Sequence, residues 1–304
     1  MSERIVLVHN PNSTRAERVP HEIFDPLRRS GIDFTFFETQ QQDTESNIAD
    51  MQSVFKDGDT IIVAGGDGTK MQAVNAALRS KVDVQLRLEG YGNYNDLSDK
   101  KLTALDIANK DYTTTVLRPM TVEVNSDYLL HSPSYLTMGF TAHAAAKFSQ
   151  EQTRKKIEQL PQSMRMLGNL AGLAAAYFEL HSYKLPPYHT SESPVVRDAV
   201  SDILLLNSKR AGGIIRSHPD YGLKDYFGYH EANVANIPAS LPFGVSALAG
   251  HAMADHLTDI QIEFEQPSTV PIQSEGEFRV LNGVSKISVH KNPADRLKIL
   301  RARK

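Results

Sequence analysis

The sequence predicts an α/β fold with two domains: an N-terminal parallel-sheet domain and a C-terminal, mostly antiparallel β-rich domain. In the first third of the chain, short apolar runs alternate with segments of helical spacing, whereas from about residue 113 short strand-like runs follow one another. The length of 304 residues is sufficient for two domains. We place the α/β domain at residues 1–115 and the β-rich domain at residues 116–285.

The first domain is predicted to contain a parallel sheet with helices on both faces. Runs rich in apolar and β-branched residues predict strands at residues 4–8, 34–37, 60–64 and 82–88. Helical spacing predicts helices at residues 19–29, 44–55 and 70–78. Strands and helices that alternate in this way form parallel sheets, in which ligands bind beyond the carboxyl ends of the strands.

The turn after the third predicted strand is the most informative segment of the chain. It has three glycines around one carboxylate, Gly65-Gly66-Asp67-Gly68-Thr69. Glycines allow a sharp turn and a close ligand, and the free N–H groups at the start of the following helix bind phosphate. A carboxylate at this place repels phosphate unless a divalent cation lies between them, so Asp67 indicates Mg²⁺. The alternative is an ordinary strand-to-helix turn whose glycines serve geometry alone.

Two further loops are expected beside this turn. Residues 10–13 follow the first strand, residues 65–69 the third and residues 90–96 the fourth, and each loop is rich in Gly, Asn or Asp. Because the carboxyl ends of parallel strands meet at one edge of the sheet, the three loops should lie together. Asn and Ser donors for phosphate or ribose, with Asp67 for the metal, indicate a nucleotide site.

The rest of the chain is typical of a β-rich domain with helical insertions. Strand patterns occur at residues 113–117, 120–124, 128–130, 202–206, 260–264 and 286–289, and helical patterns at residues 141–150 and 163–181. Widely spaced strands of this kind favour antiparallel pairing. The apolar stretch at residues 164–180 fits either the wall of an acyl-chain pocket or a buried core helix.

Composition excludes several classes of protein. The net charge of −3 argues against a nucleic-acid binder held by phosphate contacts. The absence of Cys rules out disulfides and thiolate metal sites, and it fits a cytoplasmic protein. The N-terminus lacks the apolar core of a signal peptide, and no apolar run is long enough for a membrane span. We therefore expect a cytoplasmic protein without a transmembrane segment.

Motifs from both predicted domains resemble those of one known family. They are Asn10-Pro11-Asn12-Ser13, Gly65-Gly66-Asp67-Gly68-Thr69, Gly92-Asn93-Tyr94-Asn95-Asp96 and Glu275-Gly276-Glu277. Their order and spacing resemble the diacylglycerol kinase catalytic family, which includes bacterial lipid kinases and sphingosine kinases. Residues 168–173 and 207–213 also match, so the resemblance covers nearly the whole chain. It implies that the chain end, which we place at residues 286–304, returns to the first domain.

The resemblance implies a role for each matched position. Asp67 would hold Mg²⁺ and take part in catalysis, and Glu277, which ends the motif Asp-Gly-Glu of the family, would be the general base. An Asp-Gly pair that helps a magnesium site in some members corresponds to Asp225-Tyr226, which makes Asp225 a second candidate metal ligand. The implied nucleotide contacts are Asn10, Ser13, Gly65, Gly66, Gly68, Thr69, Gly92, Asn93, Asn95, Asp96 and Glu275.

The acidic pair Glu275 and Glu277 can also be interpreted without the resemblance. The two residues lie two positions apart, so in an extended chain they would share a face. A carboxylate can act as a base for a hydroxyl group within hydrogen-bond reach. Without the resemblance, an exposed acidic turn is the competing interpretation.

Some positions depart from the family pattern. Gln72 replaces an acid, Asn93 and Tyr94 replace the Thr and Gly of the usual Gly-Thr-Gly-Asn-Asp loop, and Glu275 replaces Asp. These changes suggest either a working kinase with an altered substrate or nucleotide preference, or a protein with weakened catalysis.

The predicted function is an Mg²⁺-dependent phosphotransferase with an alcohol acceptor. It would transfer the γ-phosphate of ATP to a hydroxyl group of a diacylglycerol-like or sphingoid lipid, met at the membrane surface. One alternative is a nucleotide- or lipid-binding protein of the same fold that no longer catalyses. Another is an NAD kinase, which shares the Gly-Gly-Asp-Gly turn but not the Asn10-Pro11 or Glu275-Gly276-Glu277 motifs. The sequence leaves the oligomeric state open.

Overall fold

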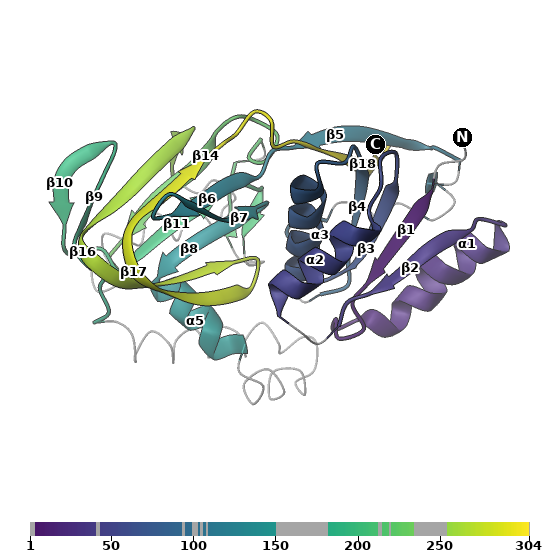
Figure 1. Ribbon diagram of the computed structural model, residues 1–304, viewed down its shortest axis with the longest axis horizontal. Helices are drawn as coiled ribbons and strands as arrows, with labels where there is room; N and C mark the ends of the chain where they lie inside the picture. The colour runs from purple at the N-terminus through teal and green to yellow at the C-terminus, as the bar shows by residue number, and fades with distance from the viewer. Residues whose placement is uncertain are drawn as a thin grey trace.

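The computed structural model forms two domains, each built on one main sheet (Figure 1). It describes residues 4–40, 43–92, 95–98, 103, 106–107, 109–149, 182–211, 215–218, 220–233 and 254–303. The predicted fold class is confirmed, because one sheet is mainly parallel and covered by helices while the other is antiparallel.

The sheet of the first domain has six strands in the order β2-β1-β3-β4-β18-β5. Their bounds are β1 Ile5–His9, β2 Phe34–Glu38, β3 Thr60–Gly65, β4 Gln85–Gly90, β5 Tyr112–Leu117 and β18 Leu297–Ala302. All neighbours are parallel except β5, which runs antiparallel to β18 at the edge. The run expected at residues 113–117 thus forms a strand of the first sheet, and the fourth strand begins three residues later than the expected start at residue 82.

Helices cover both faces of this sheet. They are η1 Ala16–Arg18, η2 Pro20–Phe24, α1 Asp25–Arg29, α2 Thr44–Val54 and α3 Asp67–Ser80. Alternate residues of β1 point to opposite faces. Val6 and Val8 pack in a core with α2 and α3, whereas Ile5 and Leu7 pack in a second core with the segment from η1 to α1. This sandwich fixes the strand ends that carry the loops.

The second domain is built on a ten-stranded antiparallel sheet. Its main path is β15-β14-β11-β8-β16-β17-β6-β7, and β9 pairs with both β16 and β10. The bounds are β6 Met120–Val124, β7 Asp127–Ser132, β8 Tyr135–Gly139, β9 Tyr188–Thr190, β10 Ser193–Arg197, β11 Asp202–Leu206, β14 Phe227–Ala232, β15 Asp255–Leu257, β16 Asp259–Ser274 and β17 Glu277–His290. Helix α5, Phe140–Ser149, and a small pair, β12 Arg210–Ala211 with β13 Ile215–Arg216, complete the described elements.

The chain crosses between the domains twice. It passes from β5 to β6 through residues 118–119 and returns from β17 to β18 through residues 291–296. Figure 1 shows β5 and β18 side by side where they approach the second domain. Two connections of this kind hold the domains in one arrangement better than a single linker does.

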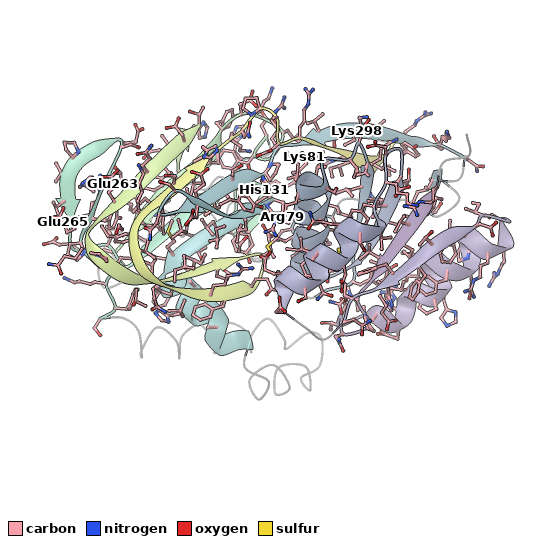
Figure 2. The ribbon with its side chains drawn as sticks, in the orientation of Figure 1. Arg79, Lys81, His131, Glu263, Glu265 and Lys298 are labelled. Atoms are coloured by element: carbon pink, nitrogen blue, oxygen red, sulfur yellow. The ribbon has the colours of Figure 1, made fainter. Side chains whose placement is uncertain are left out.

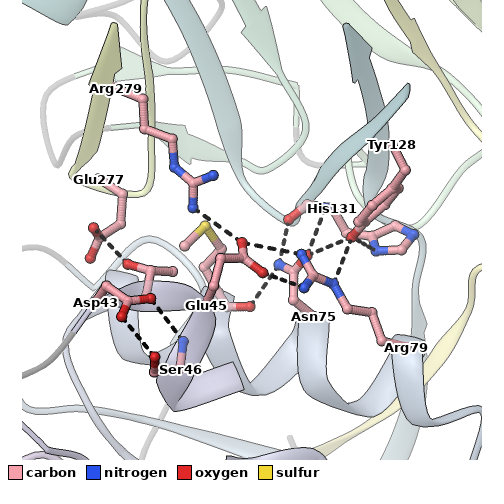
Figure 3. A network of polar contacts seen from close by, with 11 residues as sticks. Asp43, Glu45, Ser46, Asn75, Arg79, Tyr128, His131, Glu277 and Arg279 are labelled. Carbon is pink, nitrogen blue, oxygen red and sulfur yellow. Dashed lines mark hydrogen bonds and ion pairs between the residues drawn. The ribbon is translucent and has the colours of Figure 1, made fainter. Parts of the chain in front are cut away.

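Helix α3 is also attached directly to the second domain (Figure 3). The side chain of Asn75, which is fully buried, accepts a hydrogen bond from the N–H of His131 at 2.8 Å and donates one to its carbonyl oxygen at 2.8 Å. The hydroxyl of Tyr128 donates to the same Asn75 oxygen at 2.8 Å. Arg79, one turn further along α3, lies near His131 at the junction of the domains (Figure 2). The second half of α3 is therefore held in a defined position relative to the second sheet.

Among the described residues, no helix has both the length and the apolar character needed to cross a membrane.

Candidate functional site

The glycine-rich turn joins a fully buried strand to a long helix. Every residue of β3 is buried, and α3 begins at Asp67 directly after Gly66. No side chain caps the start of α3 in the part of the chain that the structure describes, which leaves its first N–H groups available to an anion. A Cβ on Gly65 would lie 2.6 Å from Thr69, so only glycine allows the Thr69 side chain to fold back over the turn.

The loop after β1 is tied to this turn. The amide of Asn10 donates to the hydroxyl of Thr69 at 2.8 Å, and its backbone N–H donates to Ala64 at 3.1 Å. The N–H of Ser13 donates to the carbonyl of Asn10 at 3.2 Å, which closes a tight turn. The hydroxyl of Ser13 is buried without a hydrogen-bond partner among the described residues. The structure thus brings Asn10, Ser13 and Thr69 together.

The loop after β4 lies beside the other two loops at the same edge of the sheet. Arg15 donates to the carbonyl oxygens of Gly90 at 3.2 Å and Gly92 at 2.8 Å, which binds this loop to the first one. The N–H of Asp96 lies 3.5 Å from a carboxylate oxygen of Asp67. The three loops therefore meet at the carboxyl ends of β1, β3 and β4. The predicted site residue Asn93, and the neighbouring Tyr94, lie outside the described residues.

Lys70 is a site residue that the sequence analysis missed. Its side chain is completely buried, and its ammonium lies 2.9 Å from Asp67 Oδ1 and 3.5 Å from Asn95 Oδ1. A signal was available in the sequence, because a cation in the first turn of a helix opposes the helix dipole. A lysine in the first turn of a helix that follows a glycine-rich turn therefore needs a local reason.

The second acidic motif forms a tight hairpin turn between β16 and β17. Ser274 pairs with Glu277, while Glu275 and Gly276 have φ angles of +52° and +86°. Two successive positive φ angles define a type I′ turn, which favours Asn-Gly or Asp-Gly, so glutamate at the first position is unusual. The expectation that Glu275 and Glu277 share a face of extended chain is wrong, because the backbone reverses between them.

Glu275 is a buried anchor of this turn. Its side chain is 3% exposed, and Oε1 accepts hydrogen bonds from the N–H groups of Ser134 at 2.6 Å and Tyr135 at 3.0 Å. The other oxygen, Oε2, is buried without a hydrogen-bond partner in the described structure. Burial, together with the negative charges of Asp67 and Asp96, raises the pKa of Glu275 well above its usual value. An exposed acidic turn is therefore excluded for Glu275.

Glu277 lies against the start of α3. A Cβ on Gly68 would lie 2.9 Å from Glu277 Oε1, and the other oxygen accepts a hydrogen bond from the hydroxyl of Thr44 at 3.1 Å (Figure 3). A carboxylate from the second domain thus reaches the glycine turn of the first. The absence of a side chain at Gly68 makes this approach possible.

Asp225 lies in a different group of contacts. It forms an ion pair with Arg118 at 2.8 Å, beside the residues that connect the two domains. Lys291, on the other connection, donates to the carbonyl of Arg118 at 2.6 Å and to the side chain of buried Asn207. Burial lowers the pKa of Lys291 to about 7, although Asp225 acts in the opposite direction. The role of Asp225 as a metal ligand stays a prediction.

The carboxylate of Asp67 suits a magnesium ion that is held in part by the phosphate groups of a ligand. Among the described residues, no group of three or more His, Asp or Glu side chains is arranged to hold a metal. Mg²⁺ commonly binds through one or two carboxylates and the phosphates of the substrate, so a single carboxylate such as Asp67 is sufficient. The chemistry of this donor set fits the group that the motifs imply.

The fold and the gathered loops define a class of protein: a two-domain α/β protein with a glycine-rich turn before a helix at the edge of its parallel sheet. Residues 4–119 match the family model of the diacylglycerol kinase catalytic domain. This match confirms, for that part of the chain, the resemblance indicated by the motifs.

Solved structures extend the likeness in fold to the second domain. A crystal structure described as a diacylglycerol kinase from Bacillus anthracis strain Sterne superimposes with a TM-score of 0.67 at 17% identity, covering 98% of this chain and 97% of that one. Two further structures from the same organism give a TM-score of 0.65 at 18% and 16% identity, covering 98% of this chain and 96% and 97% of theirs. No curated protein matches the chain.

Proposed function

We propose that the protein is a lipid kinase that transfers the γ-phosphate of ATP to a hydroxyl group of a diacylglycerol-like or sphingoid lipid. The observation that carries this proposal is the approach of Glu277 to Gly68, which brings a carboxylate of the second domain to the start of α3. The catalytic-domain match of residues 4–119 supports the nucleotide half of the proposal.

The phosphate groups of ATP would lie at the start of α3. There the N–H groups of the first helical turn and the positive end of the helix dipole attract them. Asn10 and Thr69, joined by a hydrogen bond of 2.8 Å, would border the same place, with Ser13 next to them. Asp67 would hold Mg²⁺, which neutralises charge on the transferred phosphate when bound. Phosphoryl transfer depends chiefly on such positioning and neutralisation.

Glu277 would act as the general base. Its carboxylate accepts the proton of the lipid hydroxyl while the hydroxyl oxygen bonds to the γ-phosphorus and the bond from phosphorus to the ADP oxygen breaks. The hydrogen bond from Thr44 to Glu277 Oε2 orients the carboxylate and leaves Oε1 toward Gly68. Because ATP is a cytoplasmic substrate and the acceptor is a lipid, we place the reaction at the cytoplasmic membrane surface.

The experiment that tests this proposal offers the protein γ-labelled ATP, Mg²⁺ and a panel of extracted lipids, with NAD⁺ in a parallel reaction. We expect label in a phospholipid product. Label that appears only in NADP⁺ would overturn the lipid assignment and establish the NAD kinase alternative.

A protein that binds without catalysing is the second candidate, favoured by the environment of Gln72. This residue, which stands where the family has an acid, is 8% exposed on α3. Calorimetry with a non-hydrolysable ATP analogue separates the two candidates. Binding of the analogue without turnover on any lipid would establish the binding protein, whereas absence of binding would contradict both.

A further inference from the structure

Lys70 is a buried cation at the place where the phosphate groups would bind. Its side chain has no exposed surface, and its ammonium lies 2.9 Å from Asp67 Oδ1. Two effects oppose a cation there, because burial removes its hydration and the start of a helix carries positive partial charge. The negative groups nearby must therefore compensate for both.

The surroundings of Lys70 are acidic. Asp67 is in direct contact with the ammonium, and Asn95 Oδ1 lies 3.5 Å from it. The N–H of Asp96 lies 3.5 Å from a carboxylate oxygen of Asp67, and both of these residues act electrostatically on the buried carboxyl group of Glu275. Without Lys70 the carboxylates of Asp67 and Asp96 would repel the phosphates of a nucleotide until a metal ion neutralised them.

We propose that Lys70 is a positioning residue that supplies, from within the protein, part of the charge neutralisation otherwise left to Mg²⁺. This inference rests on the proposed nucleotide site. The ammonium offsets the charge of Asp67 before a nucleotide arrives, so phosphate binding without metal is less unfavourable. Because the ammonium has the same sign of charge as Mg²⁺, it also reduces the gain in nucleotide affinity that the metal provides. Both effects lower the dependence of nucleotide binding on Mg²⁺.

The test measures how strongly Mg²⁺ and nucleotide binding are coupled. Calorimetry gives the Kd of a non-hydrolysable ATP analogue in excess EDTA and in saturating Mg²⁺, and the ratio of the two values is the coupling factor. We expect the coupling factor of Lys70→Met to exceed that of the wild type by about tenfold, mainly through weaker binding in EDTA. A coupling factor within about threefold of the wild type, or a smaller one, would overturn the inference.

Lys81→Met is the matched control, because it removes the same charge from the other end of α3. Lys81 is exposed and follows the last turn of the helix (Figure 2). The control should keep the coupling factor of the wild type. An equal rise in both variants would assign the effect to net charge and would refute a specific role of Lys70.

Lys70→Met leaves Asp67 without its cation, so this variant could fail to fold. A second variant, Lys70→Gln, keeps the inference testable in that case. Lys70→Gln keeps a hydrogen-bond donor toward Asp67 but carries no charge, and it should show the same rise in coupling factor.

Failure of the proposed function would give a different result. Wild-type protein that binds no analogue in either condition would overturn the nucleotide site itself, whereas wild-type binding with an unchanged coupling factor in Lys70→Gln would overturn only the role of Lys70.

Discussion

Two turns meet at the candidate site, and they are built in different ways. The turn between β3 and α3 has negative φ at Gly66, and its glycines provide room for the side chains of Thr69 and Glu277. The turn between β16 and β17 has positive φ at both central residues and is closed by strand pairing. The first turn has backbone N–H donors and free space at the start of α3, whereas the second turn places the carboxylate of Glu277 beside it. Catalysis as proposed requires both turns, and each can be changed separately.

The largest effect is expected from the turn of the second domain. Glu277→Gln keeps the size of the side chain and an acceptor for Thr44 but removes the basic carboxylate. We expect kcat to fall by about 10²–10⁴-fold while the Kd of the ATP analogue stays near the wild-type value. Steady-state kinetics and calorimetry measure the two quantities.

The control is Glu263→Gln, on β16 far from the first domain (Figure 2). Its kcat should match that of the wild type. A loss below about tenfold for Glu277→Gln would remove Glu277 from the role of base.

The next effect is expected from the turn of the first domain. Asp67→Asn removes the negative charge that pairs with Lys70, so both metal binding and the arrangement of the turn should suffer. We expect kcat/KM to fall by about 10²-fold or more, with weaker binding of the ATP analogue in Mg²⁺. Unlike Glu277→Gln, this variant should therefore lose affinity as well as rate.

Asp83→Asn provides the comparison for Asp67→Asn, because Asp83 is an exposed partner of Lys298 in the same domain. It should leave kinetics unchanged, as exposed ion pairs contribute little. If Asp67→Asn retains wild-type activity, Asp67 is only a turn residue, since Asn is equally tolerated in turns.

The two turns also differ in how far the sequence predicts them. The first could be derived from its pattern: a buried apolar strand, glycines, and a helix, with loops 10–13 and 90–96 brought alongside by the parallel sheet. Such contacts follow from local rules, because neighbouring strand ends share one edge. The family match over residues 4–119 falls on this same part of the chain.

The second turn could not be derived in the same way. The conformation of Glu275 and its bonds to Ser134 and Tyr135 depend on pairing between strands distant in sequence. Nothing local specifies that β18 inserts between β4 and β5. Lys70 was missed for a related reason, since helical periodicity alone does not show that a charged residue is buried against a carboxylate.

The third prediction changes the contact between the two turns. Gly68→Ala adds a Cβ that would lie 2.9 Å from Glu277 Oε1, so the flexible carboxylate must move away. We expect kcat to fall by about tenfold, less than in Glu277→Gln because the base is displaced and not removed. The melting temperature should stay equal or rise slightly, since Ala is a better helix former than Gly. Unchanged kcat in a folded Gly68→Ala variant would show that the position of Glu277 is unimportant.

The smallest effect concerns the stability that Glu275 provides. Its folded-state pKa is raised, first by burial and then by Asp67 and Asp96. A carboxyl group with a raised folded-state pKa contributes its full stability below its unfolded-state pKa, and this contribution is lost as the pH rises through the folded-state pKa. Each unit of pKa shift corresponds to about 1.4 kcal/mol. The stability that Glu275 contributes to the wild type should therefore fall as the pH rises above the unfolded-state pKa.

Glu275→Gln cannot ionise, yet it keeps an oxygen that can accept from the N–H groups of Ser134 and Tyr135. Thermal unfolding measured from pH 4 to pH 9 should show the variant gaining stability relative to the wild type as the pH rises. Glu263→Gln, whose parent side chain is partly exposed, should follow the wild-type curve throughout. Parallel curves for Glu275→Gln and the wild type would show that the pKa of Glu275 is the same in the folded and unfolded states. Divergence of the curves would show that folding raises the pKa of Glu275, as expected for a buried carboxyl group that serves the structure of the turn.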